Sequence, residues 1–211
     1  MLLGFFSYSQ TFEERIEKTK IYIDKGFRIS TAYNELEKLL EEQPNNIETL
    51  RLMGAVYSKM GRYGEAVESI NKAIAVNDTV VGLYWERAKV YATKALNGRD
   101  IEESTKLAFD DTDTMLGLGA VSKKIFELRI KIKKMEADHF SNRYNHFSPK
   151  TSSDWKDDKP DGSKELFREK AISALEQTIV DAKRIIDLEP ENEPALNIIN
   201  YTPKSIASLE N

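Results

Sequence analysis

Cysteine is missing from this chain of 211 residues. Without a thiol the protein forms no disulfide, holds no thiolate zinc or iron-sulfur centre, and carries no cysteine nucleophile. Several classes of enzyme and metalloprotein are therefore excluded before any motif is considered.

An excess of positive charge is also lacking, because the net charge is −4 at pH 7 and charged residues of both signs make up 31% of the chain. This balance argues against a general polyanion-binding surface, so nucleic acid is not an expected partner. No apolar run approaches the roughly 20 residues of a membrane-spanning helix, so membrane insertion is not expected. Hydrophobic residues still make up 40%, which is enough to form a folded core.

Helical periodicity dominates the first half of the chain. From Phe12 to about Asn97, apolar residues recur at three- and four-residue spacing. Pro44 and Gly61 stand where helices should stop. The pattern predicts an all-α protein made of short antiparallel helices. Hairpins of this size cannot bury their apolar stripes alone, so we expect them to stack on one another.

One segment carries a repeat signature. Its large and small residues follow a fixed order, namely Leu50, Met53, Gly54 and Tyr57, then Ala66, Ile70 and Ala73. This order resembles the tetratricopeptide repeat (TPR), whose period is about 34 residues. Gly54 and Ala66 lie where the two helices of such a repeat approach most closely, so small residues are required there.

The same register continues on both sides of this segment, and the resemblance covers about half of the chain. It predicts TPR-like repeats over 11–114, at about 13–46, 47–80 and 81–114. In the first repeat, Thr19 and Lys20 replace leucine and glycine, as expected of a terminal repeat that faces solvent. In the third, Arg87 replaces leucine and the second helix is displaced by a few residues.

The C-terminal part, 115–211, has a longer period. Apolar residues predict one long helix through Val121, Ile125, Leu128, Ile132 and Met135, and a second from about Ser163 to Leu188. The predicted fold is therefore a TPR-like helical-hairpin solenoid followed by a long antiparallel helix pair. The segment after Pro190 resembles the turn into a further repeat, and we expect it to cap the array.

A polar segment at 140–162 separates these two long helices. Loops of this length inside a domain are usually functional or disordered. Tyr144, Phe147 and Trp155 make its composition similar to that of protein interfaces, so they are candidate partner-binding residues. The alternative is a surface insertion whose aromatic residues cover the helix pair.

Candidates for metal or catalytic chemistry are weak. Asp110–Asp113 lacks the glycine and glutamate that a calcium loop needs, so we expect Asp111 or Asp113 to cap a helix instead. His139 and His146 are too far apart in sequence to share one zinc ion. The sequence predicts no catalytic residue, no metal site and no cofactor.

The resemblance implies a function. TPR arrays hold peptides or partner helices in a concave groove lined by the first helix of each repeat. Carried over by position, the groove residues are Arg51, Ala55, Ser58, Lys59, Trp85 and Lys89. Trp85 beside cations would anchor an acidic, partly apolar peptide, unless Trp85 is buried between repeats. Ala55 stands where carboxylate-clamp members have asparagine, which argues against that activity.

We therefore expect a non-catalytic scaffold that binds another protein or peptide. The alternative is a structural subunit that contacts its neighbours through the long C-terminal helices or the 140–162 segment. The first ten residues, with small residues at Ser7 and Ser9, resemble the end of a secretory signal. On that interpretation the protein is exported or periplasmic and begins at Gln10; otherwise these residues form an apolar first turn of a cytoplasmic protein.

Overall fold

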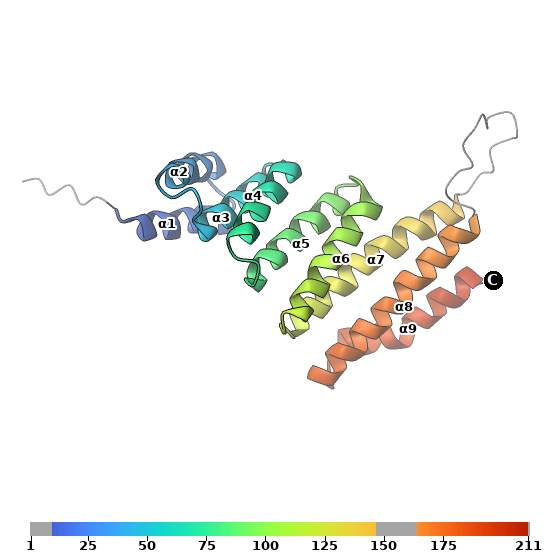
Figure 1. Cartoon of the computed structure of the whole chain (residues 1–211). Coiled ribbons are helices and arrows are strands. Elements are labelled where there is room, and N and C mark those ends of the chain that lie inside the picture. Colours follow the sequence, from blue (N-terminus) through green and yellow to red (C-terminus); the bar gives the residue numbers. More distant parts are fainter. Residues whose placement is uncertain (1–9, 147–163, 211) are drawn as a thin grey trace, which may run out of the picture. The chain divides into compact units, whose positions relative to one another are not determined.

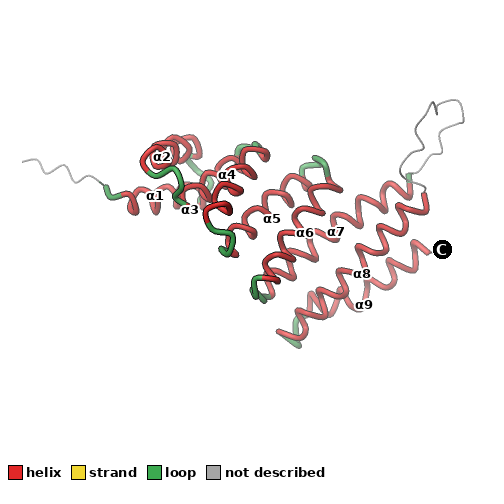
Figure 2. The backbone as a smooth tube through the Cα atoms, in the orientation of Figure 1, coloured by secondary structure: helices red, strands yellow, loops and turns green. Residues whose placement is uncertain are grey.

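The structure is a computed structural model that describes residues 10–146 and 164–210. In these residues every regular element is an α-helix (Figure 2). The helices are α1 (Phe12–Asp24), α2 (Ile29–Glu42), α3 (Ile47–Lys59), α4 (Tyr63–Val76), α5 (Val81–Leu96), α6 (Ile101–Gly117), α7 (Lys123–Asn145), α8 (Lys164–Leu188) and α9 (Glu193–Glu210). The predicted all-α class is confirmed.

The chain divides into two compact units, Met1–Val90 and Tyr91–Asn211, which are described separately below. Their boundary lies inside α5. The windows 13–46 and 47–80 hold one helical pair each, α1 with α2 and α3 with α4. Residues 1–9 of the signal-like segment 1–10 lie outside the described part of the chain.

Local sequence explains where the helices of unit 1 begin. Thr11 and Glu14 form a reciprocal capping box at the start of α1, which satisfies two backbone N–H groups. Asn46 caps α3 by accepting a hydrogen bond from the Thr49 amide at 2.9 Å. The two caps therefore stabilise the first turns of α1 and α3.

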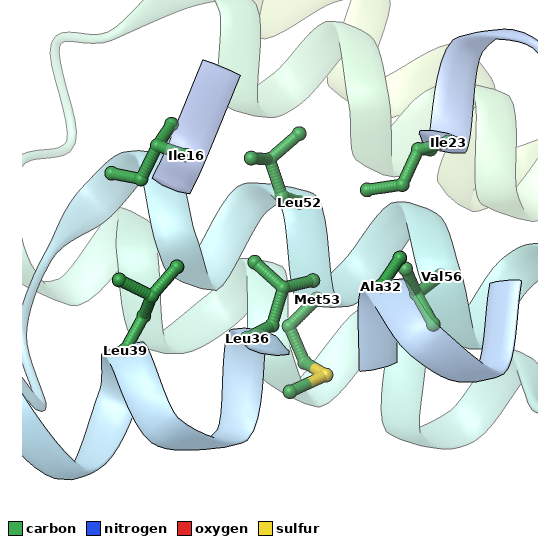
Figure 3. Close-up of a cluster of buried hydrophobic side chains, with 8 residues drawn as sticks. All are labelled: Ile16, Ile23, Ala32, Leu36, Leu39, Leu52, Met53 and Val56. Carbon is green, nitrogen blue, oxygen red and sulfur yellow. The ribbon is translucent and has the colours of Figure 1, made fainter. Parts of the chain in front are cut away.

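The core of the first repeat lies between α1, α2 and α3, where eight buried apolar side chains converge (Figure 3). They are Ile16, Ile23, Ala32, Leu36, Leu39, Leu52, Met53 and Val56. Thr19, at a position where the repeat expects leucine, is 1% exposed, and its hydroxyl donates to the Arg15 carbonyl at 2.8 Å. The hydroxyl is therefore satisfied inside the core, which explains how a polar residue is tolerated there.

The second repeat confirms the close helix approach predicted at Gly54 and Ala66. A Cβ atom added at Gly54 would lie 2.6 Å from Ile70 Cγ1 and 3.1 Å from the Ala66 carbonyl oxygen. Ala66 itself is 0% exposed. Since neither position has room for a larger side chain, the small residues set the distance between α3 and α4.

In unit 2, α7 packs extensively on α8, and α8 packs on α9 (Figure 1). Ile125, Leu128 and Ile132 are buried along α7, as the longer period predicted. Val121, which the sequence placed on this helix, instead precedes it and is exposed. None of the described helices combines the length and apolar character needed to cross a membrane.

Two further expectations about unit 2 are wrong. The polar segment does not begin at Phe140, because α7 continues to Asn145. The reason is that Phe140 is a core residue, 1% exposed and stacked on Phe167 with ring centroids 6.3 Å apart. Asp111 and Asp113 do not cap a helix, since both lie inside α6.

Candidate functional site

The predicted groove residues of unit 1 come from α3 and α5. Arg51, Ala55 and Ser58 follow one another at steps of four and three, so they share one side of α3. Trp85 and Lys89 are four apart and share one side of α5. We call these five residues, with Glu48 and Glu86, the α3–α5 face.

Trp85 is partly buried, which lies between the two alternatives that the sequence left open. On the same helix, Leu83 and Ala88 are both 0% exposed and pack toward the interior. Trp85 therefore keeps part of its surface accessible to a partner.

Arg51 is held by two carboxylates. Its Nε and Nη2 atoms donate to Glu48 at 2.7 and 2.6 Å, and its Nη1 lies 3.5 Å from Glu86 Oε1 on α5. The hydrogen bonds to Glu48 raise the pKa of Arg51 above its ordinary value. Glu86 also accepts a hydrogen bond from Lys89 Nζ at 3.0 Å. Glu86 thus joins α3 to α5 on this face.

This arrangement changes the electrostatic character predicted for the face. The sequence placed Trp85 beside cations that would attract an acidic peptide, but Arg51 and Lys89 share Glu86, and Arg51 also pairs with Glu48. The geometry therefore gives no reason to expect a preference for acidic peptides. Each glutamate precedes its cation by three residues, and this helical spacing was the signal available in the sequence.

The remaining predicted residues of α3 are less prominent. Ala55 is partly buried and packs against the core of the first repeat. Ser58 is partly buried, and Lys59 is exposed in the last turn of the helix. The α3–α5 face therefore combines one partly buried tryptophan with small, polar and ion-paired side chains.

The candidate residues of the 140–162 segment fall into two groups. Tyr144 lies on α7, is partly buried, and packs against the Phe140–Phe167 core with the Lys164 ammonium 4.7 Å from its ring centroid. Tyr144 thus contacts the core of the helix pair. Phe147 and Trp155 lie outside the described residues.

His139 and His146 line a cleft of about 700 Å³ in unit 2, together with Leu96, Met135, Arg143 and other residues of α5 to α8. Burial lowers the pKa of His139, and the positive charge of Arg143 lowers it further. His146 Nδ1 lies 2.9 Å from the Asn142 carbonyl oxygen. In the described part of the chain no three side chains of the metal-binding types gather at one point.

A buried charge cluster in unit 2 is the main feature that the sequence did not indicate. Arg129 on α7 is 6% exposed, and its Nε donates to Asp181 on α8 at 2.9 Å. Its Nη1 donates to the Thr112 hydroxyl at 2.9 Å and to Asp113, both on α6. The guanidinium also stacks on Phe109 at 3.9 Å. Asp113 and Thr112 therefore bind the Arg129 guanidinium, and Asp113 does not cap a helix.

Several solved structures are similar to this chain, and most of those described here are named as TPR proteins. The C-terminal part of a TPR repeat-containing protein from Cytophaga hutchinsonii matches with a TM-score of 0.56 at 14% identity, over 90% of this chain and 60% of that one. MamA matches with 0.52 at 19% identity, over 90% and 86%. A TPR protein from Parabacteroides merdae matches with 0.51 at 15% identity, over 92% and 72%. The fold is TPR-like.

At these identities the similarity is one of fold. No protein-family model matches the sequence, and no curated protein is similar to it. The present chain spans 60% of the length of the Cytophaga structure.

Proposed function

We propose that this protein is a non-catalytic scaffold that binds a partner peptide or helix along the α3–α5 face of unit 1. Trp85 is its main apolar contact. The observation that carries the proposal is a partly exposed tryptophan on the first-helix side of a TPR-like unit, next to the Arg51–Glu86 link. Buried aromatic contacts of this kind are the commonest hot spots of protein interfaces.

The charged side chains on this face would orient a bound peptide more than they would increase its affinity. Arg51, Glu86 and Lys89 present donors and acceptors of both signs at fixed positions, which suits hydrogen bonding to a peptide backbone and polar side chains. Such partly exposed pairs contribute little net affinity, so the apolar contact of Trp85 supplies most of it.

A co-purification experiment tests the proposal. Partners recovered from the source cell with the unaltered protein are compared with those recovered with Trp85→Ala and with Trp85→Phe. We expect Trp85→Ala to weaken partner binding by roughly thirtyfold through faster dissociation, and Trp85→Phe to retain most of it. Circular dichroism must show that both variants are folded. A folded Trp85→Ala protein that keeps its partner would exclude this face.

A second function is favoured by unit 2. Its helices α8 and α9 expose large apolar side chains, among them Val180 at 50%, Leu196 at 38% and Tyr201 at 60%. Exposed apolar residues of this size mark contact surfaces when they are contiguous. We propose as the alternative that the protein is a structural subunit bound through α8 and α9. Tyr201→Ser would then release the neighbouring protein while Trp85→Ala would not.

A further inference from the structure

Unit 1 has a cleft on the side of α3 that faces away from the α3–α5 face. Its volume is about 480 Å³, within the range of ligand-binding pockets. Leu50, Met53 and Tyr57 come from α3 at steps of three and four, which places them roughly opposite Arg51 and Ala55. The cleft is therefore separate from the site proposed above.

The floor of this cleft is apolar. Leu40, Leu50, Met53 and Tyr57 form it, and Leu40 and Tyr57 are partly buried against the cores of both repeats. The floor thus lies over the junction between the first and the second repeat. A bound side chain would contact aliphatic and aromatic atoms there.

The two walls carry negative charge. Glu37 and Glu41 project from α2, and Glu65 and Glu68 from α4, against a single lysine in the lining, Lys72. Glu68 pairs with Lys72 at 2.9 Å and Glu65 with Arg62 at 2.8 Å, and the side chains of both pairs are at least 44% exposed. Glu37 accepts a hydrogen bond from the Tyr33 hydroxyl at 2.5 Å. The lining therefore remains acidic after its internal pairs are counted.

The aromatic residue of the floor already has a cation on it. The Arg62 guanidinium lies 4.7 Å from the centroid of the Tyr57 ring, and Tyr33 meets the same ring edge to face at 5.7 Å. Aromatic faces attract cations, most strongly where water is partly excluded. The chain's own arginine shows which side-chain chemistry this surface accommodates.

We propose that this cleft between α2 and α4 docks a basic segment of a partner protein. The aliphatic stem of an arginine or lysine covers the apolar floor, and its charge lies between the carboxylates of the two walls. An apolar stem with a cationic end matches both features, whereas an acidic or purely apolar segment matches only one. A basic docking segment is thus a second contact, independent of the peptide proposed for the α3–α5 face.

The test uses two synthetic 12-residue peptides with the same leucines, one carrying four arginines and the other four glutamates. Each is titrated into the full-length protein while amide chemical shifts are followed. We expect only the arginine peptide to bind, with shifts at Leu40, Met53 and Tyr57. No binding at up to about 1 mM, equal binding of both peptides, or shifts confined to the α3–α5 face would each overturn the proposal.

Matched variants separate a docking cleft from general charge attraction. Glu41→Gln with Glu68→Gln removes one carboxylate from each wall, and the fold should tolerate both because these side chains are exposed. We expect at least about a fivefold loss of affinity. Glu13→Gln with Glu17→Gln makes the same charge change on α1 and should have less than about a twofold effect. Equal losses in the two double variants would mean nonspecific attraction.

The Trp85→Ala variant distinguishes the cleft from the α3–α5 face of the proposed function. Trp85→Ala should leave binding of the arginine peptide unchanged, because Trp85 does not line the cleft. Loss of arginine-peptide binding in a folded Trp85→Ala protein would place that peptide on the α3–α5 face and overturn the cleft assignment.

Discussion

Arg129 and Asp181 form an ion pair in the interior of unit 2, with 2.9 Å between Nε and Oδ1 and side chains that are 7% and 3% exposed. The pair connects α7 to α8, and Thr112 and Asp113 extend the cluster to α6. Three consecutive helices therefore share one arginine. Burying these charges carries a large desolvation penalty, so the ion pair itself contributes little net stability. Removing one partner is nevertheless strongly destabilising, because the other charge then remains buried without a partner.

Asp181→Ala should consequently lower the free energy of unfolding by about 3 kcal/mol, measured by urea denaturation. The surface substitution Asp187→Ala on the same helix serves as a control, because Asp187 is 67% exposed, and it should change stability by less than about 0.5 kcal/mol. The double variant Arg129→Met with Asp181→Leu should be more stable than Asp181→Ala, because it leaves no unpaired charge buried and Asp113 is 57% exposed. A loss below about 1 kcal/mol in Asp181→Ala would show that Arg129 finds water or another acceptor.

Ala66→Leu should destabilise the protein by about 1 to 3 kcal/mol through overpacking against α3. Ala66 is 0% exposed, and its carbonyl oxygen lies within 3.1 Å of where a Cβ at Gly54 would stand. Ala75→Leu on the same helix is exposed and should leave the thermal midpoint nearly unchanged. If both variants melt like the unaltered protein, α3 and α4 are not in close contact.

His139 should make stability fall as the solution becomes acidic. Burial and the charge of Arg143 lower its pKa in the folded state, while Glu102 and Glu136 oppose this and Lys170 adds to it. The unfolded chain therefore takes up a proton first, as pH drops through about 6.5, and stability is lost until the folded-state pKa is passed. His139→Gln should make the urea midpoint depend less on pH between about pH 7 and pH 5. An unchanged slope would assign the acid sensitivity to other groups.

Glu86→Gln should change partner preference more than stability. The substitution removes the carboxylate that Arg51 and Lys89 share, and the free energy of unfolding should fall by less than about 1 kcal/mol because the pairs are partly exposed. The face becomes more positive, so association with an acidic peptide should accelerate and depend more steeply on salt. Equal association rates for the unaltered protein and the variant would show that Glu86 does not screen these cations.

Local and periodic features were determined by the sequence alone. The steps of three and four residues placed the helices, Pro44 and Gly61 marked their ends, and the spacing from Leu50 to Ile70 identified a TPR-like repeat. These signals are short-range, since caps, turns and apolar stripes each act within a few residues of the chain. The close helix approach at Gly54 and Ala66 could also be predicted, because the repeat requires small residues at these two positions.

Relationships between helices were decided only by the tertiary structure. Arg129 and Asp181 stand 52 residues apart, and no spacing rule connects them. Phe140 extends α7 because it packs on Phe167 of another helix, which outweighed the polar composition around it. The charge of the α3–α5 face depends on the contact between Glu86 on α5 and Arg51 on α3. Such pairings arise when helices pack, so they follow from the three-dimensional arrangement and not from local pattern.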